Sequence, residues 1–198
     1  MIFLKHFFDF IFSLLLIILI SPILLVIALM IKLEDGGKIF YKQERVGKNR
    51  KVFKIIKFRS MVENATGMKG GYSIFENDSR ITRTGKFLRK TSLDELPQLF
   101  NILKGDMSFI GPRPPLTFHP KDYHEYEDWV LVRFKMRPGM TGLAQVNGRN
   151  DIDWYERFKY DVEYVKKWSL SYDVKILFET VRTLLSKKGI YGTDQEGK

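Results

Sequence analysis

Two adjacent carboxylates, Asp94 and Glu95, stand in the stretch KTSLDELPQLFNIL, after a basic segment and before a proline and an apolar stripe. We expect them at a helix N-terminus or a bend, where the helix dipole and the upstream cations lower their pKa values and keep both ionised. An ionised carboxylate in such a place can act as a nucleophile. The pattern also fits a purely structural role, because Ser92-x-x-Glu95 is a capping box for the helix that follows.

A candidate phosphate ligand, Arg113, lies in the run GDMSFIGPRPP and is flanked by Pro112, Pro114 and Pro115. Prolines keep the backbone extended and stiff, so the guanidinium is presented with little conformational entropy left to lose. This arrangement favours bidentate binding of a phosphate. An exposed arginine in a proline-rich turn would have the same sequence.

Further cations precede the two carboxylates. Residues 38–59 contain nine lysines and arginines and a single acid, Glu44. The alternation in KIFYKQ and KVFKIIKF predicts a β-hairpin that turns at residues 47–50 and lies against anionic lipid. Lys57 and Arg59, at the end of this hairpin, are candidates for binding a substrate phosphate.

The pattern becomes helical from Thr84, through TGKFLRKTSL, where Arg89 is a further candidate for phosphate binding. Between the hairpin and this helix, residues 63–80 are rich in Gly, Asn, Asp and Ser and predict a loop. Such a loop could close over a site or be a plain surface excursion.

The elements that position these residues begin with a long apolar segment. Residues 10–31 read FIFSLLLIILISPILLVIALMI, in which Ser13, Ser21 and Pro22 are the only non-apolar members. An unbroken helix of this length would be about 33 Å long, which indicates a membrane segment. Pro22 removes one helical N–H, so we expect a bend, and Ser21 can satisfy the carbonyl that the proline leaves free.

The bend leaves a spanning helix and a re-entrant helix about equally compatible with the apolar pattern. Lys5 and His6 precede the segment and the basic stretch follows it. The positive-inside rule therefore favours both ends on the cytoplasmic side. We expect residues 1–33 to form a re-entrant membrane helix broken at Ser21-Pro22.

The overall composition limits the possible functions. The chain has 198 residues, a formal net charge of +10 and no cysteine. Its length fits one domain with a sizeable core, and the absence of cysteine excludes disulfides, thiol nucleophiles and cysteine-ligated metals. The positive charge favours an anionic partner, whether nucleic acid, lipid headgroups or a phosphorylated substrate.

The C-terminal half is less decisive. Residues 137–150 predict glycine-rich turns around a short strand, where Arg149 would meet a nucleotide phosphate or stabilise the fold. Asp151 and Asp153 match an Asp-x-Asp metal motif, but one of them is the expected N-cap of a helix at residues 154–168. A last helix at residues 173–188 carries an apolar stripe that could lie on the membrane surface or pack on the core, and we expect the core. Residues 189–198 are expected to be a mobile tail.

Several of these motifs together resemble the bacterial sugar transferase family, the monotopic phosphoglycosyl transferases. They are KFRSM, TRTGKFLRKTSLDELPQLFNILKGDMSFIGPRPP, RPGMTGLAQVNGRN and SLSYDVKILFETVRTLL. The resemblance covers nearly the whole chain, and its compact form is similar to the PglC-type enzymes that begin glycan assembly. The implied fold is α+β: a re-entrant helix and a small, mainly helical catalytic domain with a short β-hairpin, at residues 34–188, on the cytoplasmic face of the bacterial inner membrane.

The resemblance also implies a reaction and a mechanism. A sugar 1-phosphate would pass from a UDP-sugar to a polyprenyl (undecaprenyl) phosphate in the membrane, with release of UMP. Asp94 would attack the phosphate that bears the sugar and form a covalent intermediate, Glu95 would assist the acceptor, and Mg²⁺ would bridge these carboxylates and the diphosphate. Electrostatic neutralisation and positioning can supply most of such catalysis.

Two other functions remain open from the residues alone. A metal-dependent glycosyltransferase using Asp151 and Asp153 would release UDP, although the chain lacks an N-terminal nucleotide-binding βαβ pattern. A non-catalytic membrane-bound module for anionic polymers, nucleic acid included, would explain the charge but neither the Asp-Glu pair nor the proline-flanked arginine. We therefore expect membrane lipid, a UDP-sugar and polyprenyl phosphate as partners, and no nucleic acid; the identity of the sugar and the oligomeric state are not encoded in these motifs.

Overall fold

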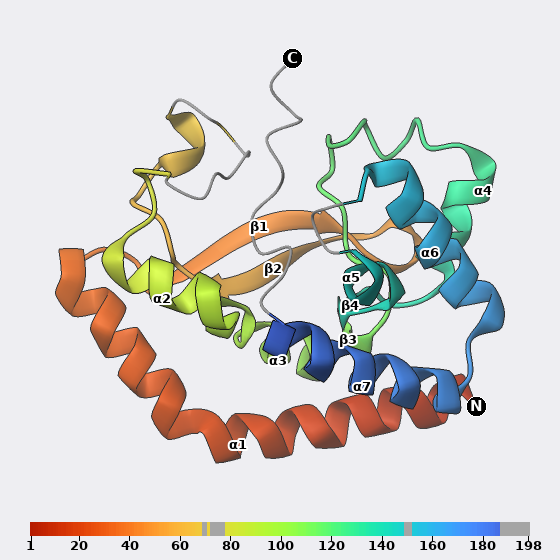
Figure 1. The fold of residues 1–198 in the computed structure, drawn as a ribbon, viewed down its shortest axis with the longest axis horizontal. Helices are drawn as coiled ribbons and strands as arrows, with labels where there is room; N and C mark the ends of the chain where they lie inside the picture. Colours follow the sequence, from red (N-terminus) through yellow and green to blue (C-terminus); the bar gives the residue numbers. More distant parts are fainter. Residues whose placement is uncertain (69–70, 72–77, 149–151, 187–198) are drawn as a thin grey trace.

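The computed structural model describes residues 1–68, 71, 78–148 and 152–186, and has the mixed α+β fold that the sequence predicts. A long N-terminal helix lies along one edge of a mainly helical domain, which contains two small two-stranded sheets (Figure 1). The expected tail at residues 189–198 lies outside the described residues.

Helix α1 runs from Ile2 to Asp35 and is bent near its middle (Figure 1). Pro22 lies inside the helix, and the Ser21 hydroxyl donates a hydrogen bond of 2.9 Å to the Ile18 carbonyl, which the proline cannot reach with an N–H. The bend that the sequence predicts at Ser21-Pro22 is thus confirmed, and the Ser21 bond explains why the helix continues through it without interruption. Only 11% of its most apolar window is buried inside the protein, so α1 is not the core helix of a soluble fold.

Both arms of α1 are bonded to the domain. In the first arm, Lys5 Nζ lies 2.6 Å from Asp173 Oδ2, and Asp9 accepts hydrogen bonds from the hydroxyl of Ser108 and the backbone amide of Phe109. These partners lie far along the chain from the helix that they contact. At the end of the second arm, the Asp35 carboxylate pairs with Arg59.

The predicted hairpin is confirmed. Strands β1 (Phe40–Val46) and β2 (Val52–Phe58) pair antiparallel, with Tyr41 opposite Lys57. The connection is the 3₁₀ turn η1 (Lys48–Arg50), within the residues where the sequence placed it. A second 3₁₀ turn, η2 (Ala65–Gly67), lies in the segment after the hairpin.

Helix α2 (Arg83–Thr91), the 3₁₀ turn η3 (Leu93–Glu95) and helix α3 (Gln98–Lys104) follow in succession. Two buried clusters fix them. One joins the second arm of α1 to β2 and α2 and consists of Ile27, Ile31, Phe58 and Leu88; the other joins β2 to α3 and consists of Ile55, Leu99, Ile102 and Met107. Ile17 and Ile20, near the bend of α1, pack against this second cluster.

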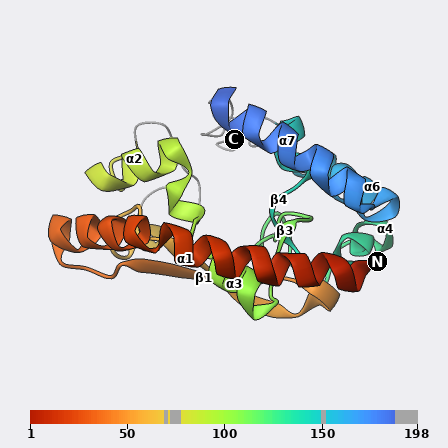
Figure 2. The ribbon, with the colours of Figure 1, turned by 90° about the horizontal axis from the view of Figure 1, so that it is seen from below.

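The remaining elements form the other side of the domain. Strand β3 (Ser108–Ile110) pairs parallel with β4 (Gly139–Thr141), which confirms the expected short strand. The helices are α4 (Asp128–Leu131), η4 (Val132–Lys135), α5 (Leu143–Asn147), α6 (Trp154–Lys167) and α7 (Leu170–Ser186). Seen from below, α1 crosses the molecule with the hairpin and α3 on one side and α2, α6 and α7 on the other (Figure 2).

Helix α7 differs from its prediction. Ile176 is buried, but Val174, Leu177, Phe178 and Val181 are each at least half exposed. The expectation that this stripe packs on the core is therefore wrong for most of the stripe. The sequence pattern defines an apolar face, but it does not tell whether that face contacts protein or another apolar medium.

Candidate active site

The turn that carries the two carboxylates is set by Ser92. This residue ends α2 in a left-handed conformation, with φ 57°, and its amide bonds to the Leu88 and Arg89 carbonyls. The chain then reverses into η3, and the next helix begins only at Gln98. A non-glycine residue with positive φ is uncommon and often occurs next to functional residues.

The predicted capping box does not form. Ser92 makes no side-chain cap bond, and only the backbone amide of Glu95 bonds back to the Ser92 carbonyl, at 3.2 Å. Since Pro97 occupies the N-cap position of α3, Asp94 and Glu95 precede that helix instead of starting it. Their side chains are consequently free for contacts across the domain.

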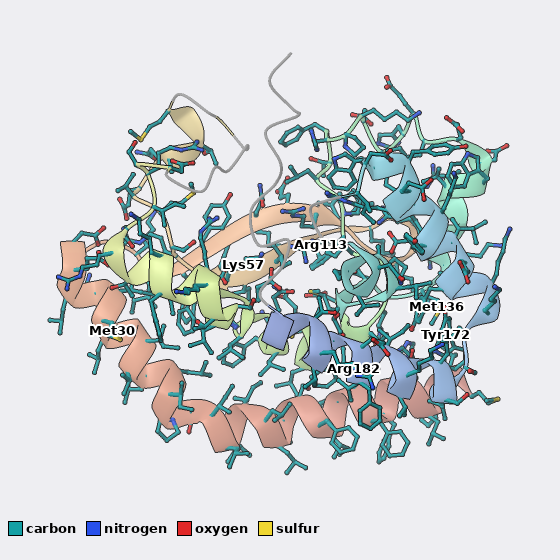
Figure 3. All side chains as sticks on the ribbon, in the orientation of Figure 1. Met30, Lys57, Arg113, Met136, Tyr172 and Arg182 are labelled. Atoms are coloured by element: carbon teal, nitrogen blue, oxygen red, sulfur yellow. The ribbon has the colours of Figure 1, made fainter. Side chains whose placement is uncertain are left out.

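Glu95 lies between two cations. Its Oε1 atom accepts a hydrogen bond of 2.6 Å from Lys57 Nζ and one of 3.3 Å from Arg113 Nη2. Lys57 comes from β2 and Arg113 from the loop after β3, and the two side chains approach the centre of the domain from different elements (Figure 3). Asn101 of α3 fixes the distance between β2 and the turn, because its side chain bonds to the Ile56 amide and the Lys54 carbonyl.

Asp94 has a different environment, in which its carboxylate makes no hydrogen bond or ion pair with another described residue. Burial raises its pKa to about 6, against the opposing effect of Lys57, and the neighbouring Glu95 charge raises it further. Burial would also raise the pKa of Glu95, but Lys57 and Arg113 outweigh it and hold that pKa well below its usual range. The expectation of two lowered pKa values is therefore correct for Glu95 and wrong for Asp94, because helix-dipole reasoning left out desolvation.

The other predicted phosphate ligands lie around this pair. The Arg89 Nε atom donates a hydrogen bond of 2.8 Å to Ser60 Oγ, and its charge lowers the pKa of Asp94. Arg59 is buried and bonds to Asp35 at the end of α1. Both line the same cavity as Asp94, whereas Arg149 lies outside the described residues.

The cavity has a volume of about 960 Å³ and is lined both by charged residues and by residues of α1. Its polar end contains Lys57, Arg89, Asp94, Glu95 and Arg113. Its apolar wall includes Leu16 and Ile20 of α1, Phe109, Met140 and Leu177. The described part of the loop predicted at residues 63–80 contributes Glu63, Asn64, Ala65, Thr66 and Gly71 to the wall.

The cavity residues that were not singled out from the sequence include Ser60, Gln145 and Arg157. Gln145 follows the predicted short strand, and both polar atoms of its side chain are buried without a hydrogen-bond partner. The motif TGLAQVNG gave no signal for this residue, because an isolated glutamine in a helix is most often a solvent-exposed side chain.

The two residues of the Asp-x-Asp motif, the alternative metal site, have different outcomes in the structure. Asp153 Oδ1 accepts a hydrogen bond of 2.8 Å from the Glu156 amide as the N-cap of α6, as predicted, and Asp153 does not line the cavity. Asp151 lies outside the described residues. In the part of the chain that the structure describes, no group of three or more His, Asp and Glu side chains is placed to hold a metal ion alone.

The donors at Asp94 and Glu95 fit a Mg²⁺ ion that also binds the substrate. Mg²⁺ is commonly held by one or two carboxylates together with substrate phosphates, so a dedicated cage of protein ligands is not required. The carboxylate of Asp94 offers hard oxygen ligands, and its pKa is raised by desolvation and by the adjacent Glu95 charge, two effects that a bound divalent cation would offset.

The sequence is similar to those of several known sugar transferases. The undecaprenyl-phosphate galactose phosphotransferase of Salmonella typhimurium is 42% identical over 204 residues, which is 96% of this chain and 42% of that protein. The UDP-glucose:undecaprenyl-phosphate glucose-1-phosphate transferase of Klebsiella pneumoniae is 45% identical, over 92% of this chain and 40% of its own length. The uncharacterized sugar transferase EpsL of Bacillus subtilis is 42% identical over 96% of this chain and 92% of its own length.

The chain thus spans about two-fifths of the length of the first two relatives and nearly all of the third. The family model for bacterial sugar transferases matches residues 1–187, which include α1, the Asp-Glu pair, the proline-flanked arginine and α7. The chain is a member of the bacterial sugar transferase family.

Proposed function

We propose that this protein transfers a sugar 1-phosphate from a UDP-sugar to a polyprenyl phosphate such as undecaprenyl phosphate, releasing UMP. The observation that carries the proposal is the position of Asp94: a partly buried carboxylate, without a hydrogen-bond or ion-pair partner among the described residues, next to Glu95, Lys57 and Arg113, in a cavity that α1 also lines. The names of two relatives support the same pair of substrates.

The geometry supports a two-step mechanism at Asp94. In the first step, a carboxylate oxygen of Asp94 attacks the phosphorus that bears the sugar, and the bond from that phosphorus to the bridging oxygen breaks as UMP leaves. In the second step, an oxygen of the lipid phosphate attacks the same phosphorus and displaces Asp94. One diphosphate linkage is lost and one is formed, so the overall free-energy change is close to zero.

The residues around Asp94 have separate roles in this mechanism. The proximity of Lys57 and Arg89 offsets part of the burial and favours the ionised nucleophile. Arg113, whose side chain is 40% exposed while also bonding Glu95, can bind a phosphate with its remaining donors. Glu95 keeps these cations in place and is suited to orient the acceptor phosphate. A Mg²⁺ ion held by Asp94 and Glu95 would neutralise charge on the diphosphate.

The apolar part of the cavity supports a lipid acceptor. Leu16 and Ile20 belong to α1, so the wall that starts at the charged residues reaches the helix expected in the membrane. A lipid chain along this wall would stay in apolar surroundings while the phosphate at its end approaches Asp94. A sugar transferase with a soluble acceptor would not need such a wall.

The contacts of α1 support a re-entrant helix. Lys5 and Asp9 in the first arm, and Asp35 at the end of the second, bond to residues of one domain. A helix that spanned the bilayer would place one arm on the opposite side and lose these bonds. We place the domain on the cytoplasmic face of the bacterial inner membrane, where UDP-sugars are made.

The proposal is tested by UMP release from a panel of UDP-sugars, with undecaprenyl phosphate and Mg²⁺, by the protein in detergent or nanodiscs. We expect UMP and a lipid-linked sugar diphosphate in equal amounts with at least one donor, UDP-galactose and UDP-glucose being the first choices. Release of UDP would instead indicate transfer of the sugar without its phosphate. Turnover with none of the donors would contradict the proposal.

A further inference from the structure

The segment that carries Arg113 has few backbone donors. Pro112, Pro114 and Pro115 lack an N–H, so this part of the chain is held chiefly through its carbonyl oxygens. Four successive carbonyls accept hydrogen bonds. The donors are the Gly139 amide to Pro112 at 2.9 Å, Arg133 Nη2 to Arg113 at 2.6 Å, Arg45 Nη1 to Pro114 at 3.1 Å and the Val46 amide to Pro115 at 3.0 Å.

The two outer bonds come from strands β4 and β1, but the two inner bonds come from arginine side chains. Arg133 is 2% exposed and lies against the rings of Phe134 and Phe158 in a buried apolar cluster. Its Nη2 atom bonds both the Arg113 carbonyl and Asp161 Oδ2, at 2.6 and 2.5 Å. Asp161 is equally buried.

A buried ion pair is seldom the most stable choice for an apolar cluster, because both charges must be removed from water. Even with their mutual bond, Arg133 Nη1 has no hydrogen-bond partner among the residues that the structure describes. A pair of apolar side chains would fill the same volume without this cost. The feature that apolar side chains would not reproduce is a charged donor on the carbonyl of Arg113.

Arg45 supplies the neighbouring bond. Its Nη2 atom is fixed by the side chain of Gln43 at 2.9 Å, which leaves Nη1 directed at the Pro114 carbonyl. Burial lowers the pKa of Arg45 to about 10, so its guanidinium remains charged at neutral pH. Charge-assisted hydrogen bonds from both arginines are shorter or stronger than bonds from neutral donors.

We propose that Arg133, held by Asp161, and Arg45 are positioning residues that fix the backbone of Arg113 and Pro114 and so direct the Arg113 guanidinium to Glu95. Arg113 Nη2 lies 3.3 Å from Glu95 Oε1, and the bonds from Arg133 and Arg45 to the Arg113 and Pro114 carbonyls fix the backbone from which this guanidinium extends. The inference rests on the proposed function for its kinetic consequences, but the predicted geometry does not depend on turnover.

The main test replaces the ion pair as a unit, with Arg133→Met and Asp161→Leu together. Removing both charges avoids leaving one buried charge without a partner, so the fold is expected to survive. The KM for the UDP-sugar should rise and kcat/KM for UMP release should fall by about tenfold to 100-fold, the loss expected when a binding group is displaced by about 1 Å. Val130→Ala is the matched control, since Val130 is buried in the same cluster and bonds nothing in the segment.

A double-mutant cycle separates positioning from general destabilisation. If Arg133 acts through Arg113, the Arg133→Met and Asp161→Leu replacement should change kcat/KM less than twofold in an Arg113→Lys background, because coupled residues are not additive. Equal effects in both backgrounds would contradict the inference. So would an equal loss of kcat/KM in Val130→Ala at a matched thermal midpoint. Arg45→Met, measured in the same cycle, tests the neighbouring bond if the paired replacement does not fold.

An experimental structure of the paired replacement gives the result that does not need turnover. We expect Arg113 to leave hydrogen-bond distance of Glu95 while Lys57 stays bonded to it. An unchanged Arg113–Glu95 contact would overturn the positioning role. Absence of UMP release by the unmodified protein would overturn the proposed function only, and leave this structural comparison as the test of the inference.

Discussion

The Lys57 ammonium lies 2.6 Å from Glu95 Oε1 and joins the second strand of the hairpin to the turn before α3. This ion pair is partly buried, with side-chain exposures of 18% and 20%, so it is screened less by water than a surface pair. It leaves the carboxylate of the adjacent Asp94 near this cation but without a hydrogen-bond or ion-pair partner in the described part of the chain. The two acidic neighbours therefore have opposite pKa shifts.

Replacement of the nucleophile is the first prediction. Asp94→Asn keeps the size of the side chain but cannot form an acyl phosphate, so UMP release should fall below detection. Labelling of the protein by a UDP-sugar with ³²P in the β position should be lost too. Glu95→Gln should still form the labelled adduct and release UMP once, while transfer to lipid fails. A folded Asp94→Asn protein with normal turnover would show that the pair is structural.

The pH dependence is the second prediction. Because Asp94 must be ionised to attack and its pKa without a bound cation is raised to about 6, the single-turnover rate of UMP release should increase with pH in the acidic range, and Mg²⁺ bound at Asp94 should move this increase to lower pH. Lys57 lowers this pKa, so Lys57→Met should move the acidic limb to higher pH. Glu95 raises it, so Glu95→Gln should move the limb to lower pH.

The control for the pH profile is Lys104→Met, at the end of α3, which removes a lysine that does not line the cavity. The acidic limb of the pH–rate profile of Lys104→Met should coincide with that of the unmodified protein. Shifts of Lys57→Met and Glu95→Gln in the same direction would be inconsistent with an attack by Asp94.

Arg113 is the third prediction. Arg113→Lys retains the positive charge but loses the planar, two-pronged donor, so kcat/KM should fall by about 100-fold or more, in the range seen when a preorganised donor is removed. If Arg113 contributes only its positive charge, kcat/KM of Arg113→Lys should change by only a few fold. Near-normal kinetics in this variant would place Arg113 outside the phosphate site.

The fourth prediction is that UMP release depends on Mg²⁺. Chelation by EDTA should stop UMP release, and added Mg²⁺ should restore it. Calorimetry in the presence of UDP gives a readout without turnover: Mg²⁺ binding should be weakened in Asp94→Asn relative to the unmodified protein. Equal binding in both proteins would assign the ion to other ligands.

Topology is the fifth prediction. The chain has no cysteine, so Phe3→Cys, at an exposed residue of the first arm, gives a single labelling site. A re-entrant α1 predicts labelling from the same side of the membrane as Lys51→Cys in the hairpin turn. Labelling of the two sites from opposite sides would mean that α1 spans. Pro22→Leu should straighten the helix and shift the population toward spanning, because the missing N–H is restored.

The sequence by itself determined the local elements and the identity of the charged residues. The apolar run and Ser21-Pro22 predicted a bent helix, and alternation in residues 38–59 predicted the hairpin, because both features depend on residues close together in the chain. The Asp-Glu pair and the proline-flanked arginine were recognisable as chemistry for the same reason: their types and neighbours already limit what they can do.

The tertiary structure decided which of these residues meet. Lys57, Glu95 and Arg113 come from three elements, and no local pattern could show that Glu95, and not Asp94, accepts the hydrogen bonds of both cations. It also reversed the expected pKa shift of Asp94, because desolvation depends on everything packed around a side chain and not on its own helix. Arg45, Arg133 and Asp161 were not singled out from the sequence, since a charged residue in an amphipathic segment is usually at the surface. Only packing buries Arg133 and Asp161 and places Arg45, which lines the cavity, against the segment of Arg113.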